Sequence, residues 1–257
     1  MPESAIFQSH IMSRLPSRIA WADGNDRIYV IRRGKTTNAK IAKPTDQVVQ
    51  TYTFSGDQYR YVYDQVACGQ KVDRKRFFQL DKANCLDCPL SGNSGSGKCY
   101  THKYMQFSGF VSMLKSIIKS GGVYVGLCGE DRTNILEMCA ASDYLRFGTY
   151  GEPSLLPIDL VRDMVEVCPG NWTGYTHQAR KEFAQPFKDY FMASAHSDKD
   201  AASITGWLSF VCVEPDDIST AVQCPASKEL SLTTCSACGL CSGVTGKGRK
   251  NIKINLH

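Results

Sequence analysis

The sequence lacks the features that mark membrane and secreted proteins. No apolar run approaches the roughly 20 residues that a helix needs to cross a bilayer. The first residues do not show the charged and then apolar pattern of a secretory signal. No segment has the composition of a disordered tail. We therefore expect a folded protein of the cytoplasm with no membrane partner.

A large excess of charge of one sign is also lacking. The 257 residues include 30 Lys and Arg and 25 Asp and Glu, which gives a formal net charge of +5. This balance permits a nucleic-acid partner without requiring one. The basic residues gather in three short segments, at residues 32–33, 74–76 and 247–250. We expect solvated surface there, with phosphate contacts as the alternative.

Cysteine, by contrast, is abundant, with 12 residues. In a reducing compartment, clustered cysteines indicate metal binding or catalysis before disulfides. The strongest pattern is a remote cysteine followed by proline and then three cysteines at two-residue intervals: Cys224, Cys235, Cys238 and Cys241. Two-residue spacers let successive thiolates turn toward one point, and Gly239 and Gly243 permit the tight backbone that this requires. We call these four residues the C-terminal cysteine set.

The C-terminal cysteine set predicts a metal centre. Three cysteines at two-residue intervals with a remote fourth are typical of ferredoxin-type iron–sulfur ligation. Structural zinc sites more often use two separated pairs, and Cys224 and Cys235 do not supply them. We therefore expect iron–sulfur binding, most simply one or two [4Fe–4S] clusters in the chain, with zinc as the alternative.

A second cysteine group lies in a loop rich in Gly and Ser and consists of Cys85, Cys88 and Cys99, the loop cysteine set. Three thiolates are one short of a closed site. The fourth ligand could be Cys68 or Cys128, or it could be missing. A missing ligand would leave one metal position open to a substrate, as in catalytic centres.

The hydrophobic pattern predicts an α/β protein. After a helix over residues 104–119, five apolar runs alternate with helical or polar stretches, at residues 123–127, 144–149, 172–176, 190–195 and 207–213. Such alternation indicates βα units and a parallel sheet. We expect a complete or partial (β/α) barrel over residues 81–257, with an open doubly wound sheet as the alternative.

Residues 1–80 are expected to form a small strand-rich region. Residues 27–32 predict one strand, and residues 48–54 with 59–63 predict a hairpin. Before them, residues 6–19 could form a short amphipathic docking helix.

Polar residues follow several predicted strands. In a (β/α) barrel the chemistry lies at the carboxyl ends of the strands, so Glu152, His177 and His196 should converge there. Histidine titrates near neutrality, which makes His177 or His196 the expected acid–base group. Arg146 would bind an anionic group, because a guanidinium matches carboxylate or phosphate.

Four motifs resemble those of a family of uncharacterised, cysteine-rich bacteriophage proteins predicted to form barrels distantly like those of radical-SAM enzymes. The resemblance covers residues 83–257. The motifs are Cys85-Leu-Asp-Cys88-Pro with Cys99-Tyr, Arg146-Phe-Gly-Thr-Tyr-Gly-Glu152, Gly174-Tyr-Thr-His177, and Cys235-Ser-Ala-Cys238-Gly-Leu-Cys241. Glu152 stands where the family usually has aspartate, and His177 where it has lysine.

The resemblance implies iron–sulfur binding and an origin in a phage, hence the cytoplasm of a host cell, but no particular reaction. The C-x-x-x-C-x-x-C string of radical-SAM enzymes is absent. We expect a redox or radical-type enzyme acting on an unknown small molecule, or a protein that contacts a host factor. The alternative is a non-enzymatic zinc protein that contacts nucleic acid or a host protein.

Overall fold

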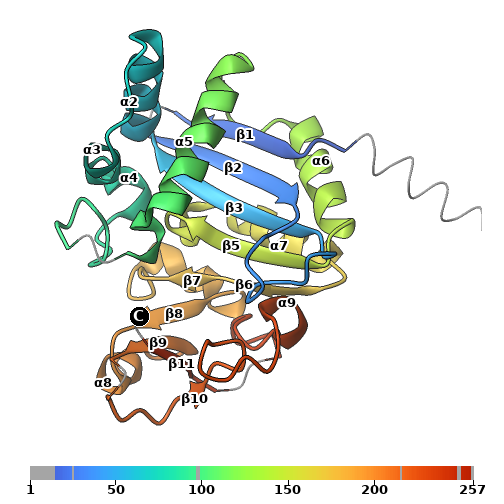
Figure 1. Ribbon diagram of the computed structural model, residues 1–257. Helices are drawn as coiled ribbons and strands as arrows, with labels where there is room; N and C mark the ends of the chain where they lie inside the picture. The colour runs from blue at the N-terminus through green and yellow to red at the C-terminus, as the bar shows by residue number, and fades with distance from the viewer. Residues whose placement is uncertain (1–14, 25, 97–98, 215, 248–249, 256–257) are drawn as a thin grey trace, which may run out of the picture.

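The computed structural model describes residues 15–24, 26–96, 99–214, 216–247 and 250–255. Their strands form a six-stranded sheet in the order β4-β1-β2-β3-β5-β6 and a five-stranded sheet in the order β10-β11-β9-β8-β7 (Figure 1). The strands are β1 (Arg18–Asp23), β2 (Arg27–Gly34), β3 (Val48–Ser55), β4 (Tyr124–Val125), β5 (Tyr144–Tyr150), β6 (Asn171–Thr173), β7 (Tyr175–Thr176), β8 (Met192–Ala195), β9 (Ser209–Val213), β10 (Val222–Gln223) and β11 (Ile252–Asn255).

The two sheets adjoin at one residue. β6 and β7 are consecutive, and only Gly174 separates them. A Cβ at Gly174 would lie 2.3 Å from the ring of Phe191, so only glycine fits between the sheets without a shift of that ring. β1, β2 and β3 pair antiparallel, whereas β3, β5 and β6 pair parallel, as do all strands of the five-stranded sheet.

Helices cover both faces of the six-stranded sheet. Figure 1 shows α5 crossing β1 to β5 on the near face and α6 and α7 on the opposite side. The helices are α2 (Gly56–Ala67), α3 (Arg74–Gln79), α4 (Lys82–Cys85), α5 (Tyr104–Lys119), α6 (Gly129–Ala140), α7 (Ile158–Val167), α8 (Asp198–Ala202) and α9 (Cys235–Cys238), with 3-10 turns η1 (Tyr100–His102), η2 (Pro153–Leu155) and η3 (Glu182–Asp189).

Side chains of β5 alternate between two apolar cores, as the period of a strand requires. Leu145 and Phe147 belong to the core beneath α6 and α7. On the other face, Tyr150 packs in the core beneath α2 and α5, and Tyr144 packs with the connection that follows β2. The strand is therefore covered on both faces, which is usual for parallel sheets.

The prediction of an α/β fold is confirmed, and each of the five apolar runs contains a strand. The hydrogen-bonded order of the described strands has edges at β4 and β10, so a closed barrel is not shown. The strands of residues 1–80 join the strands that follow, because β3 pairs with β5 in one sheet. The expected helix over residues 6–19 lies mostly outside the described residues, and residues 18–19 begin β1.

The predicted strand at residues 59–63 is wrong, because this segment lies in α2. Ser55 and Gln58 form a capping box: the Ser55 hydroxyl accepts from the Gln58 amide at 3.0 Å, and the Gln58 side chain accepts from the Ser55 amide at 3.1 Å. This pairing satisfies two backbone donors at the helix start. Among the described residues, no helix is long and apolar enough to cross a membrane.

The capping box gives a first test. Ser55→Ala removes the cap of α2 and the hydrogen bond from the Ser55 hydroxyl to the Leu80 carbonyl. We expect the free energy of unfolding in urea to fall by about 1–2 kcal/mol. Ser108→Ala, at an exposed position within α5, is the control and should change it by less than about 0.5 kcal/mol. Equal effects of the two substitutions would contradict the assigned role of Ser55.

Candidate functional site

The carboxyl ends of β5, β7 and β8 bring together three of the predicted side chains. Glu152 follows β5, His177 follows β7 and His196 follows β8. The backbone amide of His177 donates to Oε2 of Glu152 at 3.2 Å. The rings of His177 and His196 stack with centroids 5.6 Å apart and planes inclined by 22°. The three residues thus form one cluster at this edge.

Glu152 is a buried carboxyl group held by several donors. Its Oε1 accepts from the amide of Ser154 at 3.1 Å and from the hydroxyl of Ser154 at 2.7 Å, and Thr176 also donates to the carboxylate. Burial raises the pKa of Glu152 above its usual range, and these hydrogen bonds oppose the rise. Such a group can hold or release a proton within a desolvated site.

The histidine pair combines a half-buried ring with an exposed one. Burial, with a smaller contribution from His196, lowers the pKa of His177 to about 4, so this ring is neutral at pH 7. Asp200 accepts from the backbone amide of His196 at 2.9 Å, and Arg180 donates to the Asp200 carboxylate at 2.6 Å. Those contacts hold His196 against His177.

The loop cysteine set lies beside this cluster. Asp81, fully buried, accepts from the amides of Gly92 and Asn93 at 2.8 Å each. The amide of Cys99 donates to the carbonyl of Leu90 at 3.1 Å. The loop after Cys88 therefore folds back and returns Cys99 to the segment that carries Cys85 and Cys88.

The three loop thiols are buried enough to favour the neutral form. Burial raises the pKa of Cys88 to about 12, and it raises the pKa of Cys85 and of Cys99 as well. Negative charge on Glu152 adds to the rise at Cys85 and Cys88, so the carboxyl group and the thiols share one neighbourhood. Hydrogen bonds to Cys88 and Cys99 oppose part of this rise, and a bound cation would favour the thiolates further.

Two buried amide side chains at this edge were not predicted from the sequence. Among the residues that the structure describes, Asn84 Oδ1 and Gln178 Oε1 have no hydrogen-bond partner, and both residues are at most 1% exposed. Asn84 is adjacent to Cys85, and Gln178 is adjacent to His177. A buried acceptor without a partner costs about 1–3 kcal/mol, so these oxygens are suited to receive a donor from a ligand.

The C-terminal cysteine set lies at the opposite end of β5. Cys224 and Cys241 are buried in one apolar cluster with Met192 and Ile252, and Cys235 packs against that cluster. α9 carries Cys235 and Cys238, and Gly239 ends it with a left-handed φ of 68°. Gly243 also has a positive φ, of 73°. The predicted tight backbone at both glycines is confirmed.

Burial is also the largest influence on the pKa of these thiols. It raises the pKa of Cys235 to about 11 and raises the pKa of Cys224 and Cys241. Each of these three thiols is further affected by charge on Cys238, so all four lie within electrostatic range of one another. Among the described residues, however, no three Cys, His, Asp or Glu side chains form a ready-made metal site.

Comparison with protein-family models, with curated proteins and with solved structures found no match. The site is therefore interpreted from its own residues.

Arg146 does not join the carboxyl-edge cluster. It lies within β5, half-buried, and its Nη2 donates to the Tyr100 hydroxyl at 3.1 Å. Cys68 is exposed at the end of α2, and Cys128 is exposed at the start of α6. In the part of the chain that the structure describes, the side chains that interact with the loop thiols include Asp81, Glu152, Thr101, Asn84 and Tyr150. Neither Cys68 nor Cys128 is among them.

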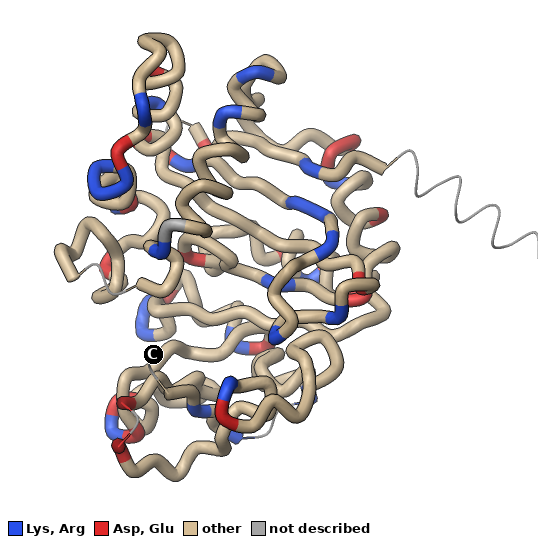
Figure 2. The backbone as a smooth tube through the Cα atoms, in the orientation of Figure 1, with Lys and Arg blue, Asp and Glu red and all other residues tan. Residues whose placement is uncertain are grey.

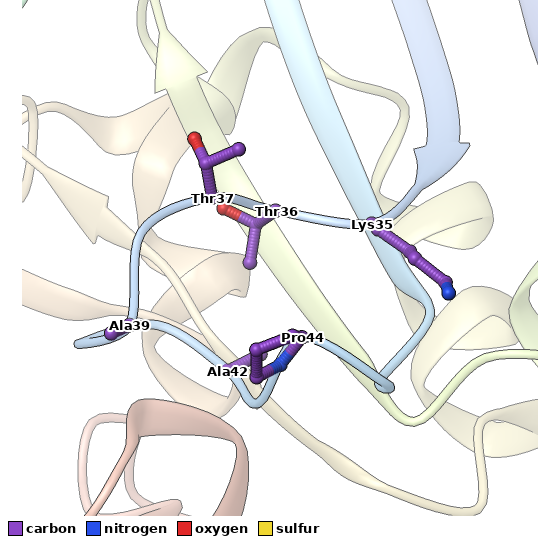
Figure 3. Close-up of a pocket in the computed structure, with 6 residues that line it drawn as sticks. All are labelled: Lys35, Thr36, Thr37, Ala39, Ala42 and Pro44. Atoms are coloured by element: carbon purple, nitrogen blue, oxygen red, sulfur yellow. The ribbon is translucent and has the colours of Figure 1, made fainter.

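A hollow of about 420 Å³ lies in the connection between β2 and β3 (Figure 3). Its lining consists of Lys35, Thr36, Thr37, Ala39, Ala42 and Pro44. The same connection holds α9, because the carbonyls of Lys40 and Ile41 accept from the amides of Cys235 and Ser236 at 2.9 and 2.8 Å. None of the predicted catalytic residues lines this hollow.

The basic segments do not combine into one patch with the cysteines. Figure 2 shows a compact basic group on α3, which contains the exposed residues Arg74 and Arg76. Arg32 and Arg33 are successive residues of β2, so their side chains point to opposite faces of the sheet. Lys247 is exposed near the end of the described chain.

The lowered pKa of His177 predicts a dependence of stability on pH. The unfolded chain binds this proton near pH 6.5 and the folded protein only near pH 4, so acidification favours the unfolded chain. As the pH falls from 7 to 5, this half-buried ring should lower the free energy of unfolding by about 1–2 kcal/mol after allowance for solvent screening. Over the same pH range, we expect the free energy of unfolding of the His177→Asn variant to fall less than that of wild type.

The measurement is urea unfolding at both pH values, together with an NMR titration of the imidazole resonances. His196→Asn, at the exposed partner ring, is the matched control. A midpoint above pH 6 for the His177 ring would contradict its assigned environment.

Proposed function

We propose that this chain is a cysteine-ligated iron–sulfur protein of bacteriophage origin, with two centres that have different roles. The C-terminal cysteine set would hold a [4Fe–4S] cluster that supports the fold or transfers electrons. The loop cysteine set would form the centre at which the protein acts. The observation that carries the proposal is that seven of the twelve cysteines form two separate groups. The loop after Cys88 returns Cys99 to Cys85 and Cys88, and the C-terminal cysteine set gathers around the apolar cluster of Cys224 and Cys241.

The donors of the C-terminal cysteine set fit a cluster in kind and number. Four thiols are the usual ligands of a [4Fe–4S] cluster, and they equally suit tetrahedral zinc. Cys224, Cys235 and Cys241 belong to an apolar cluster, where a bound metal ion would replace the protons that the buried thiols otherwise retain. A centre shielded in this way favours structure or electron transfer over contact with substrate.

The loop cysteine set supports a reactive role for a different reason. It supplies three thiols and no fourth cysteine among the described residues around it, which suits a centre with one open position. Beside it lie Glu152 and the His177–His196 pair at the carboxyl edge of parallel strands. When bound there, an iron–sulfur cluster supplies electron transfer, while Glu152 and His177 would hold or move a proton.

This arrangement supports a redox or radical-type enzyme acting on a small molecule in the cytoplasm of a host cell. Parallel pairing of β3, β5 and β6 in one sheet and of β7, β8, β9 and β11 in the adjoining sheet supports a partial (β/α) barrel as the scaffold. The phage origin and the iron–sulfur assignment draw on the motif resemblance, from which Glu152 and His177 depart. The zinc alternative predicts the same thiol ligands but no redox chemistry.

Anaerobic purification with iron, sulfide and zinc analysis tests the proposal. We expect about four irons and four sulfides for each cluster, with the visible and paramagnetic-resonance spectra of [4Fe–4S] centres. Cys238→Ser should remove the contribution of the C-terminal centre, and Cys88→Ser that of the loop centre. Stoichiometric zinc without iron or sulfide would replace the iron–sulfur assignment by the zinc alternative.

Two other cysteines provide matched controls. Cys139 is buried in the core beneath α6 and α7, and Cys128 is exposed at the start of α6. Neither Cys139→Ser nor Cys128→Ser should change the iron or sulfide content of folded protein. Loss of metal in a control variant that keeps its circular dichroism would contradict the two assigned ligand sets, and wild-type protein without any metal would refute the proposal.

A further inference from the structure

One face of β5 extends from one cysteine set to the other. Tyr144, Arg146 and Tyr150 alternate onto this face with Gly148. At the start of the strand, Cys235 packs against the cluster that contains Tyr144. At its end, Tyr150 lies within electrostatic range of Cys85. Arg146 is therefore placed between the two sets.

Arg146 has a direct link toward the loop cysteine set. Its Nη2 donates to the hydroxyl of Tyr100 at 3.1 Å. Tyr100 is the residue after Cys99, and it begins the turn η1. The arginine thus contacts the side chain of the residue that follows Cys99.

Arg146 is also held near the C-terminal cysteine set. In the sheet it pairs with Thr173 of β6. Asn171, two residues earlier in β6, donates through Nδ2 to the carbonyl of Ser236 at 2.6 Å, which fixes α9 beside this strand. Arg146 therefore lies in the strand next to the one that holds α9, and α9 carries Cys235.

The surroundings of Arg146 in the described part of the chain are polar but uncharged. Among the described residues no carboxylate forms a salt bridge with it. Its polar surroundings are the hydroxyl groups of Tyr52, Tyr100, Tyr144 and Tyr175. A cation away from water is costly unless an opposite charge compensates it. Metal-bound thiolates in the neighbouring cysteine set would provide that charge.

We infer that Arg146 is a counter-cation of the C-terminal metal centre and, through Tyr100, positions the segment that carries Cys99. The inference rests on the proposed function, because it requires a metal-thiolate centre at Cys235. It gives Arg146 a different role from the binding of a substrate anion, which the sequence pattern had indicated. Arg146 is in this view a positioning and tuning residue and not a catalytic one.

The test compares Arg146→Gln, Arg146→Met and Arg146→Lys with wild type and with the control Arg162→Gln, at an exposed position on α7. Two neutral variants are made because either one could fail to fold. The readouts are the midpoint potential of the C-terminal cluster, followed by its paramagnetic-resonance signal, and the rate at which a chelator removes the metal.

We expect both neutral variants to shift the midpoint potential to more negative values, because reduction adds negative charge that Arg146 would compensate. They should also lose metal to the chelator several-fold faster, whereas Arg146→Lys should retain most of the wild-type behaviour and Arg162→Gln all of it. If zinc occupies the site, the chelator rate alone is the readout.

The outcomes separate the two proposals. Wild-type protein without metal would refute the proposed function itself. Metal-loaded wild type, with the same potential and the same chelator rate in folded Arg146→Gln or Arg146→Met, would overturn the inference and leave the function standing. An effect of equal size in Arg162→Gln would also overturn it, since net charge and not position would then be responsible.

Discussion

The parallel pairing of β5 with β3 is the constraint on which the arrangement of this protein depends. It joins the antiparallel strands of the first 80 residues to the parallel strands that follow, so both parts of the chain share one sheet. It also covers β5 on both faces. Leu145 and Phe147 face the core of α6 and α7, which leaves the other face to Tyr144, Arg146 and Tyr150.

That second face of β5 spans the distance between the two cysteine sets. Because a strand rises about 3.3 Å per residue, Tyr144 and Tyr150 lie about 20 Å apart along β5. One cysteine set lies at each end of this span. The carboxyl end also receives Glu152, His177 and His196, because β7 and β8 run parallel to β5 through the junction at Gly174. β5 thus lies between the C-terminal cysteine set and the carboxyl edge at which the proposed chemistry would take place.

Burial governs the electrostatics at both ends. It raises the pKa of the clustered thiols and of Glu152, and it lowers the pKa of His177. All of these shifts favour neutral groups. A bound metal ion would reverse the balance for the thiols alone, since it supplies the positive charge that the apolar surroundings withhold.

Local patterns in the sequence determined the apolar strand runs, the helix α5, and the tight backbone at Gly239 and Gly243, because each of these depends on neighbouring residues. The capping box of Ser55 and Gln58 is equally local, and it outweighed the β propensity of the tyrosines that follow. Spacing likewise identified the cysteine groups. Tertiary structure alone decided that Arg146 lies between them and that Asp81 anchors the loop. It also decided that the oxygens of Asn84 and Gln178 are buried without a partner among the described residues. These features depend on which strands become neighbours, and that choice is made by contacts between residues far apart in the chain.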